Sequence, residues 1–332
     1  MNLIIPMAGM GKRMRPHTLI TPKPLIPVGG KPIVRRLVED IAPICEDPIN
    51  EIGFIIGDFG QAVETELLEI ASSLGAKGKI YYQNEALGTG HAIYCAEQSL
   101  SGPVIVAFAD TLFRADFKID ESKEGVIWVK QIDDPSQFGV VKIDDDGIIT
   151  DFVEKPKEFV SDLAIIGIYF FRDGDHLKRE LKSLIDNNIM KGGEYQLTDA
   201  LENMKSQGVV FTPGEVDNWM DCGNKNATVE TNAMILGFEN ENQISADAVV
   251  SNSTIIPPVY IGPKAQIKNS VIGPHVSIGA KSTIKDSRIS NSIIRNDSSV
   301  TNAVLDNSLV GTHAHIKRLP LDCSLGDYST IE

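Results

Sequence analysis

The chain has 332 residues, of which 42% are hydrophobic and 23% charged, with a formal net charge of -14 and a sequence pI near 4.9. This length predicts two domains, because single hydrophobic cores seldom grow beyond about 250–300 residues. The acidic charge disfavours a nucleic-acid partner, and no apolar run approaches the ~18 residues that a membrane span needs. Without a secretory signal pattern either, we expect a cytoplasmic protein with no membrane partner. The four cysteines, Cys45, Cys95, Cys222 and Cys323, are far apart and lack CxxC spacing, which predicts neither a zinc site nor disulfides.

Short apolar runs alternate with helical patterns over the first 110 residues. The apolar runs begin at Asn2, Glu51, Lys79 and Val104. Such a succession predicts a mostly parallel α/β sheet with functional loops at the carboxyl ends of its strands. Further strands are expected at 126–131, 139–144 and 164–171, with a hairpin turn at 144–147, so the sheet should be mixed. Helices are expected near 175–190, 196–206 and 226–238.

Beyond residue 240 the pattern changes to single aliphatic residues spaced by five or six positions among Ser, Asn, Asp, Gly and Pro. These positions are Ile244, Val250, Ile255, Ile261, Ile267, Ile272, Ile278, Ile284, Ile289, Ile294, Val300, Leu305, Val310 and Ile316. A hexapeptide repeat of this kind predicts a parallel β-helix of four to five coils, with one aliphatic residue per side pointing inward. The alternative is a disordered tail, which would not keep an aliphatic register. The expected fold class is therefore α/β: a Rossmann-like mixed-sheet domain at 1–240, then a left-handed parallel β-helix at 241–332.

The segment after the first strand is basic in an acidic protein. The first 38 residues hold seven Lys or Arg and no Asp or Glu, which indicates a local anionic ligand. The glycine loop "AGMGKRM" is not a dinucleotide fingerprint, because Met14 stands where Gly or Ala is needed, nor a P-loop, because Arg13 follows Lys12. What remains is a loop whose backbone N–H groups approach a phosphate, with Arg13 and Lys23 as cationic arms. A solvated turn with surface lysines is the alternative.

Several motifs in order resemble one family. The pattern Ala-Gly-x-Gly-x-Arg from Ala8, followed by Pro22-Lys23-Pro24, resembles the signature of sugar-1-phosphate nucleotidylyltransferases. The segments "QNEALGTGHAIYCA", "FGVVKID", "FVEKPKE", "IIGIYFF", "GGEYQLTDA" and "NWMDCGN" continue the likeness. The repeats, which close in "SLGDYSTIE", are similar to the longer, β-helix-bearing glucose-1-phosphate thymidylyltransferases. Lys12 departs from the family, which usually has Thr there, and adds charge beside the phosphates.

The resemblance implies a role for each matching residue. Arg13 and Lys23 would be catalytic, and Mg²⁺ would be held by Asp110 and Asp221, since carboxylates suit this ion. The nucleotide would contact Ala8, Gly9, Gly11, Lys12, Gln83, Gly88 and Asp110, and the sugar phosphate would contact Gly139, Glu154, Lys155, Gly167, Tyr169 and Glu194. In isolation, Asp110 after an apolar run would be a turn or cap residue, Gln83 a surface residue and "EKPKE" a solvated loop.

The implied reaction is in-line attack by glucose-1-phosphate on the α-phosphorus of dTTP, which gives dTDP-glucose and pyrophosphate without a protein nucleophile. UTP in place of dTTP is an alternative, because "LGTGHA" is also similar to uridylyltransferases of N-acetylglucosamine-1-phosphate. Acyl transfer in the β-helix is a further one, since His275, His313 and His315 lie in the repeat. A non-catalytic regulatory subunit is disfavoured, because it would be expected to lose one of Arg13, Lys23, Asp110 and Asp221, and all four are present. The end coils of the β-helix expose strand edges that need covering, which predicts either a homo-oligomer or docking to another domain.

Overall fold

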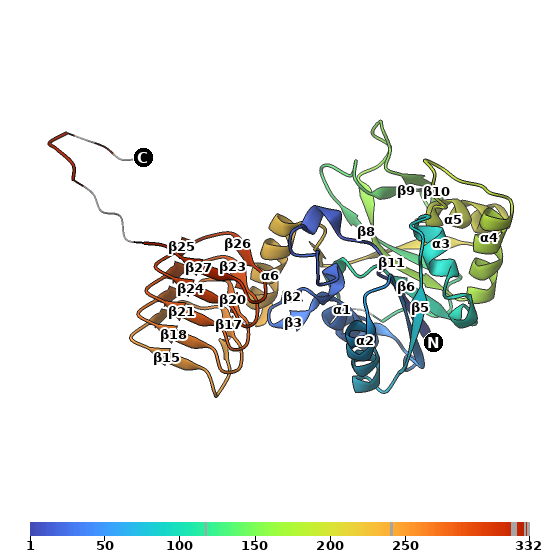
Figure 1. Ribbon diagram of the computed structural model, residues 1–332. Coiled ribbons are helices and arrows are strands. Elements are labelled where there is room, and N and C mark those ends of the chain that lie inside the picture. The colour runs from blue at the N-terminus through green and yellow to red at the C-terminus, as the bar shows by residue number, and fades with distance from the viewer. Residues whose placement is uncertain (117, 240–241, 320–323, 329, 331–332) are drawn as a thin grey trace. The chain divides into compact units, whose positions relative to one another are not determined.

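The computed structural model describes residues 1–116, 118–239, 242–319, 324–328 and 330 (Figure 1). Cys323 and the last two residues of the "SLGDYSTIE" segment lie outside these described residues, as does Ser329. The chain divides into two compact units, one of residues 1–26 and 32–223, the other of residues 27–31 and 224–332. Within the described ranges, no helix is both long enough and apolar enough to cross a membrane.

The first unit is built on a mixed sheet, in which nine strands pair among the described residues. The order is β10-β9-β11-β6-β1-β4-β5, and β8 joins β11 to β12. Their bounds are β1 (Asn2–Pro6), β4 (Glu51–Ile56), β5 (Lys77–Tyr82), β6 (Val104–Ala107), β8 (Gly125–Gln131), β9 (Gly139–Ile143), β10 (Ile149–Glu154), β11 (Leu163–Phe171) and β12 (Phe211–Glu215). Strands β1, β4, β5 and β6 run parallel, whereas β11 is antiparallel to β6, β8 and β9. The predicted mixed α/β sheet is confirmed.

In the described part of this unit, three helices connect the parallel strands β1, β4, β5 and β6, and two more follow β11. They are α1 (Ile33–Ile41), α2 (Gln61–Ser73), α3 (Thr89–Tyr94), α4 (Gly174–Asp186) and α5 (Leu197–Ser206), with short 3-10 turns η1 (Lys12–Met14), η2 (Lys23–Leu25), η3 (Ala42–Ile44) and η4 (Glu97–Ser99). Apolar residues of α3, α4 and α5, such as Ile93, Leu181 and Leu201, pack with Val106 and Phe171 of the sheet into one buried core. This apolar contact fixes where the loops at the strand ends emerge.

The order of the strands reverses at β1. From β1 the chain passes to β4 and β5 on one side, and then crosses to β6 on the other side of β1. Loops that follow β1 and β6 therefore leave the sheet edge in opposite directions and open a crevice between them, which is where open α/β sheets bind ligands.

The hairpin predicted at 144–147 joins β9 and β10. Asp144 Oδ1 accepts hydrogen bonds from the backbone N–H groups of Asp146 and Ile148, at 3.1 and 2.8 Å. The predicted turn is thus confirmed, with an aspartate side chain closing it.

The second unit contains three parallel sheets that wrap around a common core. One sheet holds β14 (Gln243–Ile244), β17 (Val259–Ile261), β20 (Val276–Ile278), β23 (Ser292–Ile294) and β26 (Ser308–Val310); another holds β15 (Val249–Ser251), β18 (Gln266–Lys268), β21 (Thr283–Lys285), β24 (Ser299–Thr301) and β27 (His315–Lys317); the third holds β16 (Thr254–Ile255), β19 (Val271–Ile272), β22 (Arg288–Ile289) and β25 (Val304–Leu305). Successive strands of the chain belong to successive sheets, as in a parallel β-helix.

The 14 aliphatic positions of the repeat form three ladders, one per sheet. Ile261 pairs with Ile278, Ile267 with Ile284, and Ile272 with Ile289 in register. The ladder residues of the middle coils are fully buried, whereas Ile244 and Val250 in the first coil are 41% and 37% exposed. The predicted coil architecture, with one aliphatic residue per side, is confirmed.

Helix α6 (Lys225–Glu239) packs against the coils. The buried Asn232 Oδ1 accepts hydrogen bonds from Ser277 Oγ at 2.6 Å and from the Gly29 N–H at 2.9 Å. Gly29 lies between the short strands β2 (Pro27–Val28) and β3 (Lys31–Pro32). The compact units therefore divide before α6, at Gly223, whereas the sequence placed the boundary after it, at residue 240. The helical periodicity of the sequence predicts α6, but it does not show which unit the helix packs against.

Replacement of Ile284 by alanine should destabilise the second unit by about 2–5 kcal/mol, because the residue is fully buried in the coil core. Both tryptophans, Trp128 and Trp219, lie in the first unit, so the urea transition seen by circular dichroism should shift while the tryptophan fluorescence transition stays. The matched control is Val304→Ala, at a position 79% exposed. If the urea transition shifted equally in the two variants, the burial of Ile284 in the coil core would be contradicted.

Candidate functional site

A cavity of about 250 Å³ lies at the carboxyl ends of β1, β5 and β6. Its walls come from the loops that follow these strands, from η2 and from α3. Seven of the residues singled out in the sequence line it, namely Ala8, Gly9, Lys23, Gln83, Gly88, Asp110 and Glu194. The structure therefore brings the predicted nucleotide-contacting residues largely into one place, at the crevice where the strand order reverses.

The loop after β1 folds back on itself at Gly11. This glycine has a φ of +55°, and a Cβ there would lie 3.0 Å from Thr18 Cγ2 and 3.2 Å from Lys23 Cβ. Thr18 Oγ1 donates to the Gly11 carbonyl at 2.8 Å. This close packing places Lys23 beside the strand end, while Lys12 and Arg13 are exposed on the outer turn η1 and do not line the cavity.

Asp110 and Asp221 are brought together by a short sheet that the sequence analysis missed. Strand β7 (Thr111–Arg114) pairs antiparallel with β13 (Asn218–Asp221), so that Thr111 lies opposite Asp221. The Cys222 N–H donates to the Asp110 carbonyl at 2.9 Å. Both strands have only four residues, too few for a clear alternation of polar and apolar side chains.

Two cationic side chains balance these carboxylates. Lys23 Nζ lies 2.6 Å from Asp110 Oδ2, with the side chains 14% and 38% exposed. A Cβ on Gly223 would lie 3.0 Å from Asp221 Oδ1 and 3.3 Å from Arg13 Nη2, so the guanidinium stands close to the second carboxylate. Burial and, secondarily, the charge of Asp110 raise the pKa of Asp221, although the Gly223 N–H and the two cations act in the opposite sense.

The donor set suits one hard divalent cation that is also bound by a ligand. Among the described residues no cluster of three or more His, Cys, Asp or Glu side chains could enclose a metal by itself. Mg²⁺ commonly takes one or two protein carboxylates and completes its shell with water and phosphate oxygens. Asp110, which lines the cavity, and Asp221, which lies opposite Thr111 on the paired strand, fit that pattern.

Gln83 follows β5 and contacts the turn before α3. Its Nε2 lies 3.1 Å from the Gly88 carbonyl oxygen and 3.1 Å from His91 Nδ1. Gly88 has a φ of +106°, and a Cβ there would be 2.5 Å from the carbonyl oxygen of Tyr195. Only glycine can occupy this position without displacing the neighbouring backbone.

The turn before α3 is bound to the segment that precedes α5. The Tyr195 N–H donates to the Leu87 carbonyl at 2.8 Å, and its carbonyl accepts from the Gly90 N–H at 2.8 Å. Thr89 Oγ1 accepts from the Leu197 N–H at 3.0 Å, while Gln196 Nε2 donates to Glu194 Oε2 at 3.0 Å. Glu194 is thereby held over the same cavity as Gln83.

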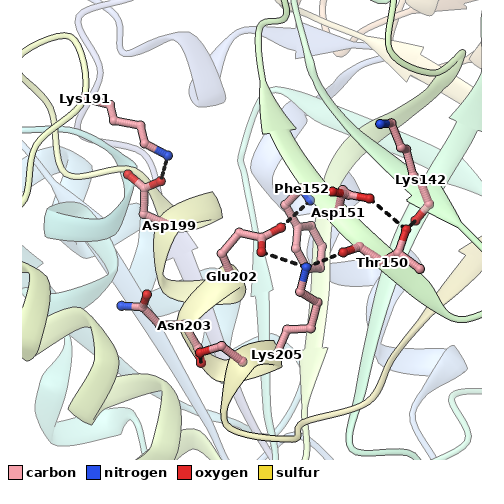
Figure 2. Close-up of polar contacts among 10 residues, drawn as sticks. Lys142, Thr150, Asp151, Phe152, Lys191, Asp199, Glu202, Asn203 and Lys205 are labelled. Carbon is pink, nitrogen blue, oxygen red and sulfur yellow. Dashed lines mark hydrogen bonds and ion pairs between the residues drawn. The ribbon is translucent and has the colours of Figure 1, made fainter.

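Helix α5 also supports the strand that carries Glu154. Figure 2 shows that Glu202 Oε1 accepts from the Phe152 N–H of β10, at 2.6 Å, and that Lys205 joins Glu202 at 2.7 Å. At the other end of the helix, Asp199 forms an ion pair with Lys191, whose turn leads into Glu194. One helix thus connects two of the residues predicted to face the sugar.

Of the remaining residues predicted for the sugar phosphate, Gly139 and Glu154 are partners in the β9–β10 ladder. A Cβ on Gly139 would lie 3.0 Å from Glu154 Oε2, so the glycine leaves space for this carboxylate. Lys155 has a φ of +42°, and its Nζ lies 3.4 Å from Glu154 Oε1. None of the three lines the cavity.

Gly167 and Tyr169 lie on β11, behind the cavity wall. The Gly167 carbonyl accepts from the N–H of Phe108, which lines the cavity. Tyr169 is buried in the core, and its ring meets the Phe108 ring edge-on at a centroid distance of 6.1 Å. Burial raises the pKa of its phenol. The aromatic contact supports the position of Phe108 beside Asp110.

Comparison with known proteins identifies the family. The nucleotidyl transferase family model matches residues 3–237, and the model described as the GMPPB C-terminal domain matches residues 255–321. Among curated relatives, the Haloferax volcanii low-salt glycan biosynthesis nucleotidyltransferase Agl11 is 31% identical over 73% of this chain and 69% of its own length. The bifunctional protein GlmU of Methanococcus maripaludis is 30% identical over 78% of this chain, but the match covers only 62% of GlmU.

A solved structure supports the same assignment. A Bacillus anthracis protein assigned as a glucose-1-phosphate thymidylyltransferase, solved with sucrose, is 26% identical and superposes with a TM-score of 0.61. The match covers 70% of this chain and 94% of that one. Since the family model spans well over half of the residues and includes every strand that borders the cavity, the chain belongs to the nucleotidyl transferase family.

Proposed function

We propose that this protein transfers a nucleotidyl group from a nucleoside triphosphate to a sugar-1-phosphate, with dTTP and glucose-1-phosphate as the preferred pair. The observation that carries the proposal is a group of opposite charges at one strand end. Lys23 and Asp110 line the cavity together with Gln83, and Asp221 and Arg13 lie close to this pair. The Agl11 and Bacillus anthracis relatives support a nucleotidyl transfer in sugar chemistry.

The main obstacle to such a reaction is repulsion between two phosphate anions. A phosphate monoester has a second pKa near 6, so the sugar phosphate is largely dianionic at neutral pH and needs no general base. Lys23 would neutralise charge at the α-phosphate and Arg13 at the leaving phosphates, while Lys155 would approach the sugar phosphate. Positioning and charge neutralisation of this kind are what phosphoryl transfers demand.

Asp110 and Asp221 would hold Mg²⁺, which when bound supplies positive charge to the phosphate oxygens. In the protein alone, Lys23 occupies Asp110 Oδ2. A bound triphosphate would give the ammonium a second anionic partner, so that Asp110 can turn to the ion. Gln83 and the Gly88 turn would contact the base, and Glu194 and Glu154 the sugar hydroxyls.

UTP is the second candidate nucleotide, supported by the similarity to GlmU. The decisive experiment measures pyrophosphate release for each common nucleoside triphosphate combined with several sugar-1-phosphates. Release with dTTP and glucose-1-phosphate above every other pair supports the proposal; a UTP preference would replace it, and no release with any pair would reject it.

Acyl transfer in the β-helix lacks a comparable arrangement. His275 Nδ1 lies 3.2 Å from Asn291 Oδ1, and His315 Nδ1 lies 2.7 Å from Ser299 Oγ, so both rings have neighbours within the coils. The same assay set can include acetyl-CoA, whose consumption would support a second activity.

Lys23→Ala should lower kcat by about 10²-fold or more, because it removes a charge that acts where the transition state is most anionic. The fold should persist, since the Asp110 side chain left behind is 38% exposed and stays hydrated. Steady-state kinetics and a thermal melt measure both effects. Lys123→Ala, at an exposed position, is the control, and turnover close to wild type in Lys23→Ala would reject this role.

Chelation with EDTA should abolish turnover, and added Mg²⁺ should restore it. In Asp221→Asn the Mg²⁺ concentration for half-maximal activity should rise about tenfold or more, because one of two carboxylate ligands is lost. Asp217→Asn, at an exposed position immediately before the same strand, should behave as wild type. An unchanged Mg²⁺ requirement in Asp221→Asn would contradict its role as a ligand.

Gly88→Ala should weaken nucleotide binding at least tenfold, because its Cβ would collide with the Tyr195 backbone and move the turn that Gln83 contacts. Gly60→Ala is a close control: Gly60 also precedes a helix with a positive φ, +82°, but nothing lies within 4 Å of its added Cβ. Calorimetric titration with dTTP separates the two. If both variants bind equally well, the close approach at Gly88 has no bearing on the nucleotide.

A further inference from the structure

The side-chain amide of Gln83 has protein partners for both of its N–H groups. Its Nε2 faces the Gly88 carbonyl oxygen and His91 Nδ1, each at 3.1 Å. An amide nitrogen has two donor hydrogens and the amide oxygen only accepts. With the nitrogen occupied twice, Oε1 is the group of this amide that a ligand in the cavity can engage.

The neighbours of the amide decide which way it points. The Gly88 carbonyl can only accept a hydrogen bond, so the nitrogen must face it. His91 Nδ1 must then accept as well, which places the ring proton on Nε2 and keeps the imidazole neutral. Burial lowers the pKa of His91, although the charge of Glu85 acts in the opposite sense, and the neutral form is thereby favoured.

The His91 ring is itself held in place. It lies on α3, with its centroid 6.4 Å from that of the Tyr195 ring at an interplanar angle of 30°. Tyr195 is fixed by its backbone hydrogen bonds to Leu87 and Gly90 on either side of Gly88. The acceptor that meets Gln83 is therefore presented by a packed ring on a helix.

We propose that His91 is a positioning residue for nucleotide selection: it holds Gln83 with Oε1 toward the cavity, so that the site favours a base with a ring N–H. Uracil and thymine carry a proton on N3, whereas N3 of cytosine is an unprotonated acceptor that would oppose Oε1. The proposal rests on the proposed function of the cavity as a nucleotide site. It adds the residue that sets which atom of the Gln83 amide faces the base.

A merely structural role for His91 has a different signature. Loss of ring packing would lower stability or weaken the binding of every nucleotide by the same factor. Loss of the acceptor at Nδ1 would instead let the amide rotate, because only the Gly88 carbonyl would still select its orientation. The ratio of affinities for UTP and CTP therefore reports the positioning role.

The test compares His91→Asn with His91→Leu in the full chain. Asn places an acceptor oxygen where Nδ1 stands, while Leu has similar size and no acceptor; both remove the ring. Binding of dTTP, UTP and CTP is measured by calorimetry with Mg²⁺ and without sugar phosphate, and thermal melts check folding. His91→Ala serves as the acceptor-free variant if His91→Leu does not fold.

In the wild type, UTP and dTTP should bind at least tenfold more tightly than CTP. His91→Asn should keep this ratio within about twofold, and His91→Leu should reduce it about fivefold, the value of one hydrogen bond of about 1 kcal/mol. The proposal is overturned if the wild type does not discriminate, if His91→Leu keeps the full ratio, or if His91→Asn loses as much as His91→Leu.

Failure of the His91 proposal can be distinguished from failure of the proposed function. Binding ratios need no turnover, so an absence of pyrophosphate release with every substrate pair would reject the transferase reaction and leave the calorimetric comparison valid. Conversely, robust turnover with equal affinity for UTP and CTP would reject the role of His91 alone.

Discussion

One backbone hydrogen bond, from the Cys222 N–H to the Asp110 carbonyl, joins the two segments on which the candidate site depends. Asp110 follows a strand in the middle of the sheet, and Asp221 arrives much later in the chain on a strand of four residues. Without this bond and the pairing of Thr111 with Asp221, two like charges would have no reason to share a site. Burial and, secondarily, the charge of Asp110 raise the pKa of Asp221, and Lys23 and Arg13 act in the opposite sense.

The site is a balance of charge in a molecule that is strongly acidic elsewhere. Cations from the first loop lie against carboxylates, and each carboxylate is within reach of one cation before any ligand is present. In the proposed reaction, an arriving triphosphate would meet groups that are already oriented and would exchange one set of ionic partners for another. Preorganisation of this kind limits the rearrangement that binding requires.

The sequence was informative where a single local rule decides the structure. Apolar runs located the parallel strands, and the aliphatic spacing located all 14 ladder positions, since a side chain that must point inward once per side leaves a period in the sequence. Contacts between distant segments were not readable: the pairing of β7 with β13, the packing of α6 against Ser277, and the support that α5 gives to Glu194. His91 and Gln196 stood inside quoted motifs, but hydrogen bonds to Gln83 and Glu194 leave no spacing signal.

The coils of the second unit do not all have the same length. Along one ladder, Ile244, Ile261 and Ile278 are 17 positions apart, whereas Ile278, Ile294 and Val310 are 16 apart, and the register is unbroken. The extra residue of the longer coils falls at one corner, where the chain reads Pro257-Pro258 and Gly273-Pro274. One residue can therefore be inserted or deleted at that corner while the strands stay in register. Coils of unequal length can be stacked, exchanged or added in this way without disturbing the buried aliphatic ladders.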